Sequence, residues 1–230
     1  MARGALIVFE GPEGAGKTTQ LRLLADWLTA RARDVVAVRE PGGTPLGDQI
    51  RRVLLDPRSE IVPRAEALLF MASRAQLVEH EIRPALSSGA SVLVDRFFLS
   101  TYAYQGSGRG LAEDELRAAN DVATGGLVPD VTLLLTLSPE EGLARAAKRG
   151  ERDRMERAEL AFHERVARAF DAYATLDWQR AHPECGPIVP VDATGGQSLV
   201  FGRVLAALGA RWPGSFPLEE PSHSARRDST

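Results

Sequence analysis

Short apolar runs alternate along the chain with longer segments of helical periodicity. Five runs are rich in Val, Ile or Leu, and none alternates cleanly with polar residues: 5–10, 34–39, 90–95, 130–136 and 187–192. Such runs are typical of strands in a parallel sheet that is covered on both faces. The segments between and after them predict helices near 17–32, 46–55, 63–88, 112–125, 139–149, 157–182 and 196–209. This alternation indicates βαβ units, and so a three-layer α/β fold with a five-stranded parallel sheet flanked by helices.

The predicted helix 63–88 has two distinct faces. Apolar residues at helical spacing predict its core stripe: Leu68, Met71, Ala75, Val78 and Ile82. Phe70 and Arg74 are four residues apart and meet on a face beside that stripe. A ring next to a guanidinium would suit stacking on a planar base and hydrogen bonding to its edge. Periodicity alone favours the simpler interpretation, in which Phe70 packs under a neighbouring helix and Arg74 is solvated.

Composition and charge narrow the class of protein. The 230 residues are 44% hydrophobic and 26% charged with a net charge of −3, a globular balance that gives no general case for nucleic-acid binding. Cys185 is the only cysteine, which excludes a disulfide within the chain and predicts an ordinary buried thiol. No apolar stretch has the length of a membrane span, and no separate signal segment precedes the first strand, so we expect a cytoplasmic protein.

The end of the chain differs in composition from the rest. From residue 211 onward Pro, Ser, Glu and Arg dominate. We therefore expect one domain over 1–210 and a mostly disordered tail over 211–230, with Trp212 and Phe216 docked locally.

Residues 11–18 carry the most specific motif. Gly-Pro-Glu-Gly-Ala-Gly-Lys-Thr has the G-x-x-x-x-G-K-[ST] spacing of a phosphate-binding loop, and it lies between a predicted strand and a predicted helix, as the motif requires. Its glycines let backbone N–H groups surround phosphate oxygens, and the helix N-terminus adds partial positive charge. Lys17 is expected to hold the β- and γ-phosphates, and the Thr18 hydroxyl to ligate Mg²⁺. The loop predicts binding of a nucleoside triphosphate but does not identify the phosphate acceptor.

Two polar clusters follow predicted strands at their carboxyl ends, where ligands bind in open α/β sheets. Asp95 and Arg96 end an apolar strand, which places the acid to approach Mg²⁺ and the arginine to grip a phosphate. The loop 39–44 leaves another strand and begins with Arg39 and Glu40. A ligand-binding loop and a simple Pro-Gly-Gly turn explain this second cluster equally well.

A basic segment lies further along the chain and is interrupted by Gly150. Five cations fall within ten residues: Arg145, Lys148, Arg149, Arg152 and Arg154. Cations in a last helical turn stabilise the helix dipole, which is the simpler explanation. Their number in a protein of net negative charge favours a lid at about 145–156 that delivers an arginine to the transferring phosphoryl group.

Together these stretches resemble the thymidylate kinase (dTMP kinase) family of nucleoside monophosphate kinases. The matching segments occur in the family's order: 9–19, 39–44, 69–74, 95–96, Ser100 with 103–106, and 149–154. The resemblance implies a P-loop nucleoside monophosphate kinase fold, phosphorylation of dTMP by ATP with Mg²⁺ in dTTP biosynthesis, and a homodimer. The alternatives are a kinase of another nucleoside monophosphate or of a deoxynucleoside, and a nucleotide-dependent switch or assembly ATPase.

The resemblance also implies which residues form the site. ATP would be bound by Gly11, Pro12, Glu13, Gly14, Ala15, Gly16, Lys17, Thr18 and Thr19. The acceptor would be bound by Glu10, Arg39, Glu40, Arg51, Phe70, Arg74, Arg96, Ser100, Tyr104 and Gln105. The metal would be held by Thr18 and Asp95.

Within this set the resemblance assigns individual roles. Phe70 would stack on thymine, with Arg74 and Ser100 at the base edge. Tyr104 would lie where a ribose 2′-hydroxyl would be and so favour deoxyribose. Arg96 would hold the acceptor's phosphate, Arg51 is a second candidate to reach it, and Glu10 would lie near acceptor and metal.

The catalytic arginine is expected in the lid. The variable positions of the phosphate loop contain no arginine, and this is similar to the bacterial type of the family, whose lid supplies it. Arg149 is the first candidate, and the alternatives are Arg145, Arg152 and Arg154. The other predicted catalytic residues are Lys17, Arg96 and Glu10. The chain departs from the family pattern at Phe97, where many members have Tyr or His, and in the tail after residue 210.

Overall fold

A computed structural model of the chain describes residues 3–147, 154–155 and 159–216. Its centre is a parallel sheet of five strands in the order β2-β3-β1-β4-β5. The strands are β1 (Leu6–Glu10), β2 (Val35–Arg39), β3 (Ser91–Asp95), β4 (Val131–Thr136) and β5 (Ile188–Asp192). All five predicted strands are confirmed, and each begins one residue later than predicted.

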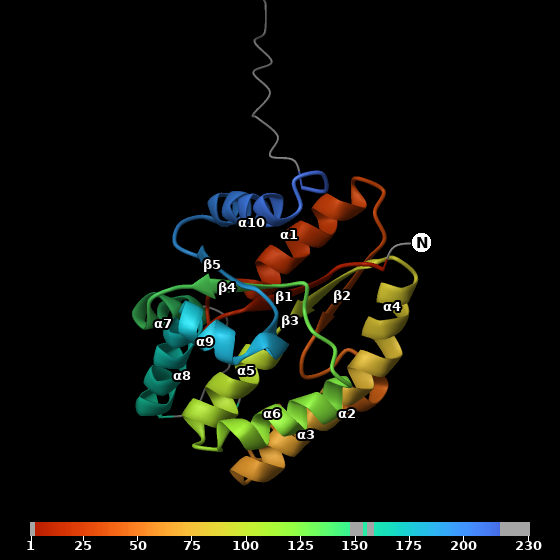
Figure 1. The fold of residues 1–230 in the computed structure, drawn as a ribbon. Coiled ribbons are helices and arrows are strands. Elements are labelled where there is room, and N and C mark those ends of the chain that lie inside the picture. Colours follow the sequence, from red (N-terminus) through yellow and green to blue (C-terminus); the bar gives the residue numbers. More distant parts are fainter. Residues whose placement is uncertain (1–2, 148–153, 156–158, 217–230) are drawn as a thin grey trace, which may run out of the picture.

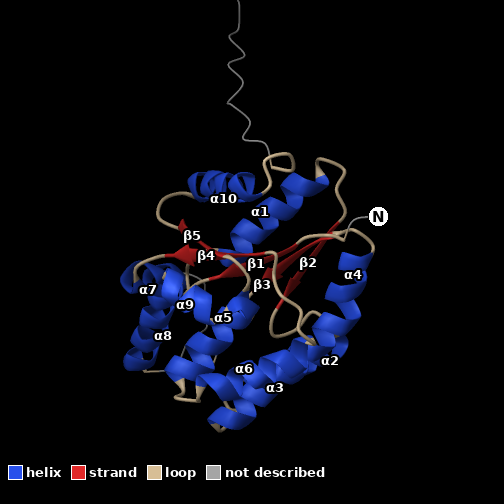
Figure 2. Cartoon of the chain, viewed as in Figure 1, coloured by secondary structure: helices blue, strands red, loops and turns tan. Residues whose placement is uncertain are grey.

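Helices lie on both sides of the sheet, which confirms the predicted three layers (Figures 1 and 2). One face is covered by α1 (Lys17–Thr29) and α10 (Gln197–Arg211). The other helices lie across the opposite face or at the carboxyl edge: α2 (Pro45–Leu55), α3 (Pro63–Leu77), α4 (Arg83–Ser87), α5 (Phe98–Thr101), α6 (Glu113–Thr124), α7 (Pro139–Ala147), α8 (Leu160–Tyr173) and α9 (Leu176–Ala181).

The alternating side chains of β1 divide the core into two clusters. Ile7 and Phe9 pack into the cluster between the sheet and the helices α1 and α10. Leu6 and Val8 pack into the cluster on the opposite face of the sheet. All four are buried, because β1 has a strand on either side and helices on both faces. The prediction that every strand is covered on both faces was wrong for β2. Ala37 in β2 is exposed, because β2 lies at the edge of the sheet.

The predicted helix 63–88 is interrupted. A π-helical turn, η1 (Val78–Ile82), separates α3 from α4. Pro84, in the first turn of α4, has no N–H to donate to a preceding carbonyl, and the wider turn accommodates it. The predicted core stripe was wrong at Leu68, which is 64% exposed. The buried face of α3 instead includes Met71, Arg74 and Leu77, because α3 packs between α2 and α6.

One helix is absent from the prediction. Residues 98–108 form α5 followed by a second π-helical segment, η2 (Tyr102–Gly108). Their Ser, Thr, Gly and aromatic residues have weak helix propensity. The helix begins because the Glu10 carboxylate, from the end of β1, accepts hydrogen bonds from the backbone N–H groups of Phe97 (2.7 Å) and Ser100 (3.0 Å). A carboxylate distant in sequence thus replaces the local N-cap.

The C-terminal helices also differ from the prediction. The expected helix 157–182 is divided into α8 and α9, because the Thr175 side chain caps α9 by accepting from the Trp178 N–H. A short 3₁₀ turn, η3 (Pro183–Cys185), leads into β5. Phe216, beyond α10, is buried and stacks on Trp27 with ring centroids 5.7 Å apart. The remaining tail, 217–230, lies outside the described residues. No helix in the described ranges is long and apolar enough to cross a membrane.

Candidate active site

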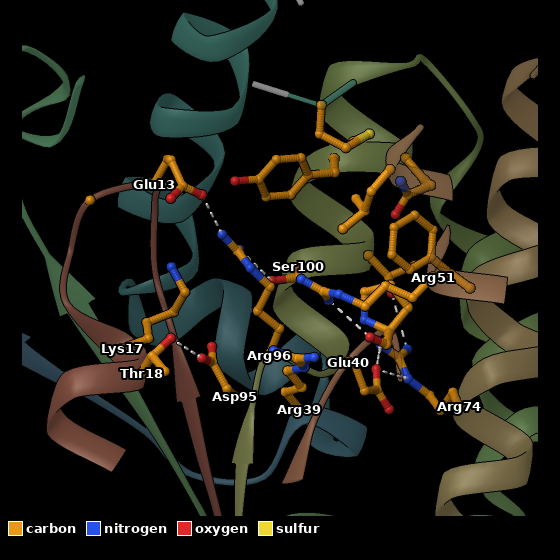
Figure 3. Close-up of a pocket in the computed structure, with 18 of the residues that line it drawn as sticks. Glu13, Lys17, Thr18, Arg39, Glu40, Arg51, Arg74, Asp95, Arg96 and Ser100 are labelled. Carbon is orange, nitrogen blue, oxygen red and sulfur yellow. Dashed lines mark hydrogen bonds and ion pairs between the residues drawn. The ribbon is translucent and has the colours of Figure 1, made fainter. Parts of the chain in front are cut away.

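One cavity of about 280 Å³ opens at the carboxyl ends of β1, β2 and β3 (Figure 3). Most predicted site residues line it: Glu13, Gly14, Gly16, Lys17, Thr18, Thr19, Arg39, Glu40, Arg51, Phe70, Arg74, Asp95, Arg96, Ser100, Tyr104 and Gln105. Residues assigned to the donor and residues assigned to the acceptor therefore face one continuous space. Gly11, Pro12, Ala15 and Glu10 are not among the described lining residues.

The phosphate loop (residues 11–18) has a backbone that only glycine suits at some positions. Gly14 has φ of +76°, and a Cβ there would lie 2.1 Å from the carbonyl oxygen of Gly142. The loop therefore packs directly on the first turns of α7. Lys17 Nζ donates to the carbonyl oxygens of Gly11 (3.0 Å) and Pro12 (2.8 Å), which holds it over the loop. Burial, with help from the Arg96 charge, lowers the pKa of Lys17 to about 8.

The side chains of Thr18, at the end of the phosphate loop, and Asp95, at the end of β3, lie next to each other. The Thr18 hydroxyl donates to Asp95 Oδ2 at 2.5 Å. Within the described residues, no group of three His, Cys, Asp or Glu side chains could hold a metal. A hydroxyl and one carboxylate suit Mg²⁺, which keeps waters and substrate phosphates as its other ligands.

Arg96 is held at the centre of the cavity by an unusual backbone conformation. Its φ is +73°, which is rare for a residue with a side chain and costs about 1–3 kcal/mol. Its guanidinium donates to Glu13 Oε2 and to Ser100 Oγ, both at 3.0 Å, and lies 5.1 Å from the Tyr104 ring centroid. Burial opposes the charge, but Tyr104, Glu13 and other acids outweigh it and raise the pKa of Arg96, so the cation is permanent.

Glu10 lies behind Ser100, one of the residues that line the cavity. It is fully buried, and besides its two bonds to backbone N–H groups it accepts from Ser100 Oγ at 2.7 Å. Its carboxylate thus supports Ser100, which does line the cavity. Glu10 therefore positions Ser100 but is not itself among the described residues that line the cavity.

Arg74 is the largest fully buried side chain described. Its Nε and Nη2 donate to Glu40 Oε2 at 2.8 and 2.5 Å, and Nη2 also donates to the Phe97 carbonyl oxygen at 2.8 Å. Nη1 donates to Thr101 Oγ1 at 3.0 Å and to Asn120 Oδ1. These contacts engage all the N–H groups of a guanidinium. The simpler interpretation of Arg74 as a solvated side chain was wrong, because Glu40 and the 97–101 segment enclose it.

The candidate lid arginines fall into two groups. Arg149 and Arg152, with Lys148, lie outside the described residues. Arg145 donates to Glu141 Oε1 (2.5 Å) and to the Ala193 carbonyl oxygen (3.0 Å). Arg154 donates to Glu66 Oε2 at 2.6 Å and to the Leu54 carbonyl oxygen at 2.7 Å. Neither of the two described arginines is among the residues that line the cavity.

Some lining residues were not predicted from the sequence: Pro41, Leu55, Thr101, Met155 and His163. His163 is notable because its Nε2 is buried without a hydrogen-bond partner. It comes from α8, and no motif or spacing marked it. Thr101 lies next to Ser100 on one helical turn, so an assignment of helix to 98–108 would have drawn attention to it. Cys185 is fully buried, and burial raises the pKa of its thiol, as expected for a structural cysteine.

The fold and the cavity together define a P-loop nucleoside monophosphate kinase: a parallel sheet presents a phosphate loop and, beside it, a wall of aromatic and arginine side chains. The thymidylate kinase family model matches residues 9–182. The chain belongs to the thymidylate kinase family.

Individual relatives agree with this assignment. The thymidylate kinase of Deinococcus radiodurans is 49% identical over 211 residues, which cover 92% of this chain and 99% of that protein. The thymidylate kinase of Gloeobacter violaceus is 53% identical over 189 residues, 81% of this chain and 86% of that protein. The crystal structure of the Ehrlichia chaffeensis thymidylate kinase matches with a TM-score of 0.69 and 30% identity, covering 89% of this chain and 98% of that one.

Proposed function

We propose that this protein transfers the γ-phosphoryl group of ATP to the 5′-phosphate of dTMP, giving dTDP and ADP, in the synthesis of dTTP. The observation that carries this proposal is the single cavity that joins the phosphate loop to Phe70 and Tyr104. The donor end offers Lys17 and the helix N-terminus, and the acceptor end offers two aromatic rings.

Phosphoryl transfer needs alignment and charge neutralisation more than covalent help from the protein. An oxygen of the acceptor 5′-phosphate forms a bond to the γ-phosphorus, and the bond from that phosphorus to the β–γ bridging oxygen breaks as ADP leaves. The acceptor oxygen is already ionised near neutral pH, so no strong general base is required. Lys17, which is mostly protonated below its pKa of about 8, and the permanent cation Arg96 supply positive charge to this reaction.

Thr18 and Asp95 would hold Mg²⁺ through oxygen ligands. When bound, the ion neutralises charge on the β- and γ-phosphates. Glu10 supports the same region indirectly, since its carboxylate fixes Ser100 and the start of α5.

Positions along the cavity wall support the proposed acceptor roles. Phe70 is half-buried and faces the cavity, which supports stacking on thymine. Ser100 borders the same space and is proposed to read the base edge. Arg74 also borders it, but because protein acceptors already engage its N–H groups, a base edge would have to replace one of these acceptors for Arg74 to read it. Tyr104 is proposed to disfavour ribose. Arg96 is proposed to hold the acceptor's phosphate. Arg39, Glu40, Arg51 and Gln105 complete the proposed acceptor wall.

The catalytic arginine is proposed to come from a lid at 145–156, with Arg149 as the first candidate. Because Arg145 and Arg154 already bond to protein groups away from the cavity, they are the weaker alternatives. We further propose that residues 1–210 form one kinase domain and that the protein works in the cytoplasm, where ATP and nucleotides are available.

A homodimer is also proposed. Three neighbouring helices, α2, α3 and α6, each expose a large apolar side chain. Val53 is 49% exposed, Leu68 64% and Val122 85%. A partner copy that covered these side chains would remove apolar surface from water.

A coupled assay of ADP release tests the function. The wild-type protein is assayed with ATP and Mg²⁺ against dTMP, dUMP, AMP and thymidine, and without any acceptor. We expect dTMP to give the highest kcat/KM. If dTMP were no better than AMP, the acceptor assignment would fail, and ADP release that did not depend on an acceptor would indicate a switch or ATPase.

A further inference from the structure

Glu66 is a buried carboxylate that the reaction described above does not use. It lies on α3, is 0% exposed and is not among the described lining residues of the cavity. It accepts from Gln105 Nε2 at 2.9 Å, from Arg154 Nη2 at 2.6 Å and from Arg109 Nε and Nη2 at 3.3 Å. A buried charge is costly unless it is paired and hydrogen-bonded, and these three partners provide both.

The partners keep this carboxyl group ionised. Burial by itself raises the pKa of Glu66, but hydrogen bonds from Gln105, Arg154 and Arg109 outweigh burial and leave the pKa below its ordinary value. An ionised carboxylate has no proton to donate, so every neighbour must offer it a donor.

This requirement decides the orientation of one amide in the cavity wall. Gln105 is 1% exposed and lines the cavity from η2. Its Nε2 must face Glu66, because turning the amide by about 180° would bring its oxygen against a carboxylate. Gln105 therefore presents one arrangement of donor and acceptor to a bound ligand.

We propose that Glu66 is a positioning residue that fixes the Gln105 amide and thereby sets which pyrimidine base the acceptor end of the cavity accepts; this rests on the function proposed above. Thymine offers a donor at N3 and an acceptor at O4, whereas cytosine offers an acceptor at N3 and a donor at N4. An amide locked in one orientation complements one of these patterns, and an amide that can turn over complements either.

The same carboxylate positions a second part of the wall. Arg154, held by Glu66, donates its backbone N–H to the Leu55 carbonyl oxygen at 3.2 Å. Leu55 and Met155, the residue after Arg154, both line the cavity. Arg154 therefore positions the cavity wall. This role differs from the catalytic role that is proposed for a lid arginine.

The test compares kcat/KM for dTMP with kcat/KM for dCMP in five proteins: wild type, Glu66→Gln, Gln105→Ala, the double variant and Arg109→Met. In Glu66→Gln the new amide could donate as well as accept, so the amide of Gln105 would be released. We expect Glu66→Gln to lower the dTMP-to-dCMP ratio about tenfold, the effect of one hydrogen bond to the base. In the Gln105→Ala background, Glu66→Gln should lower the ratio no further, because its target is gone.

Arg109→Met is the matched control. It removes one partner of Glu66 but leaves the Glu66–Gln105 bond, so the ratio should stay at the wild-type value. A folded Glu66→Gln protein with an unchanged ratio overturns the proposal, as does equal loss of activity on both acceptors or an additive effect in the double variant. If Glu66→Gln does not fold, Gln105→Ala decides: a lowered ratio supports the proposal and a wild-type ratio overturns it. A wild-type protein without preference for dTMP would instead contradict the proposed function.

Discussion

The Thr18 hydroxyl donates a 2.5 Å hydrogen bond to the Asp95 carboxylate, which joins the phosphate loop to the end of β3. The two residues are 77 positions apart in the sequence. They meet because β1 and β3 are neighbours in register, with Phe9 opposite Asp95, so the loop after β1 starts beside the carboxyl end of β3. Two residues separately predicted as metal ligands thus lie within one hydrogen bond of each other.

Asp95→Asn should raise the Mg²⁺ concentration needed for half-maximal activity at least tenfold, about the loss seen when metal-site groups are changed. The amide oxygen can still accept from Thr18, so the free energy of unfolding should change little. The measurement is activity against Mg²⁺ at saturating ATP and dTMP. Asp192→Asn is the control, because Asp192 also ends a parallel strand but does not line the cavity. Equal effects of the two substitutions would remove Asp95 from the metal site.

Phe70→Ala should raise KM for dTMP roughly 5–150-fold, because stacking on a base is worth about 1–3 kcal/mol. KM for ATP should stay near the wild-type value, since Phe70 lies at the acceptor end of the cavity. Steady-state kinetics with each substrate varied in turn measures both constants. Leu69→Ala, the neighbouring residue outside the described cavity lining, provides the comparison. A matching rise in both constants would indicate general damage to the fold.

Arg149→Ala should lower kcat by about a thousandfold, the lower range for an arginine that stabilises phosphoryl transfer. The affinity for ATP, measured by equilibrium binding, should fall much less. Arg145→Ala should have a smaller effect on kcat, because Arg145 is bonded to Glu141 and Ala193. Unchanged turnover in Arg149→Ala would move the catalytic role to Arg152.

Leu68→Glu should shift the protein from dimer to monomer. The substitution puts a charge at a side chain that is 64% exposed, so the monomer fold should tolerate it while a covered apolar interface should not. Light scattering measures the mass, and circular dichroism checks the fold. The exposed Leu199, on α10 across the sheet, allows a matched Leu199→Glu control that should leave the mass unchanged. A wild-type mass equal to the 24.9 kDa of one chain would exclude the dimer.

Cys185 should resist thiol reagents in the folded protein. Attack requires the thiolate, and burial raises the pKa of this thiol well above its ordinary value, so near pH 8 the folded group stays protonated as well as covered. The unfolded chain should react with a chromogenic disulfide as fast as a free cysteine. The rate measured with and without denaturant checks this, and rapid reaction of the native protein would show that the segment around η3 opens easily.

Site residues could be predicted where the pattern that marks them lies within a short stretch of sequence, and could not where their surroundings come from distant segments. The phosphate loop is contiguous, so Gly14, Lys17 and Thr18 could be assigned from spacing. Arg74 and Phe70 could be paired by helical spacing, but periodicity favoured the wrong environment for Arg74. Its burial depends on Glu40, which comes from the loop after β2, and no local pattern contains that information.

By itself the sequence determined the five strands, the phosphate loop and most of the residues around the cavity, because apolar runs and glycine spacing act within a few residues. Tertiary structure decided what depends on groups far apart in the chain. Glu10 starts the unpredicted α5 by bonding its first N–H groups. Glu66 needs Gln105 and Arg154 to be a stable buried anion, and these three residues, distant in sequence, meet only in the tertiary structure.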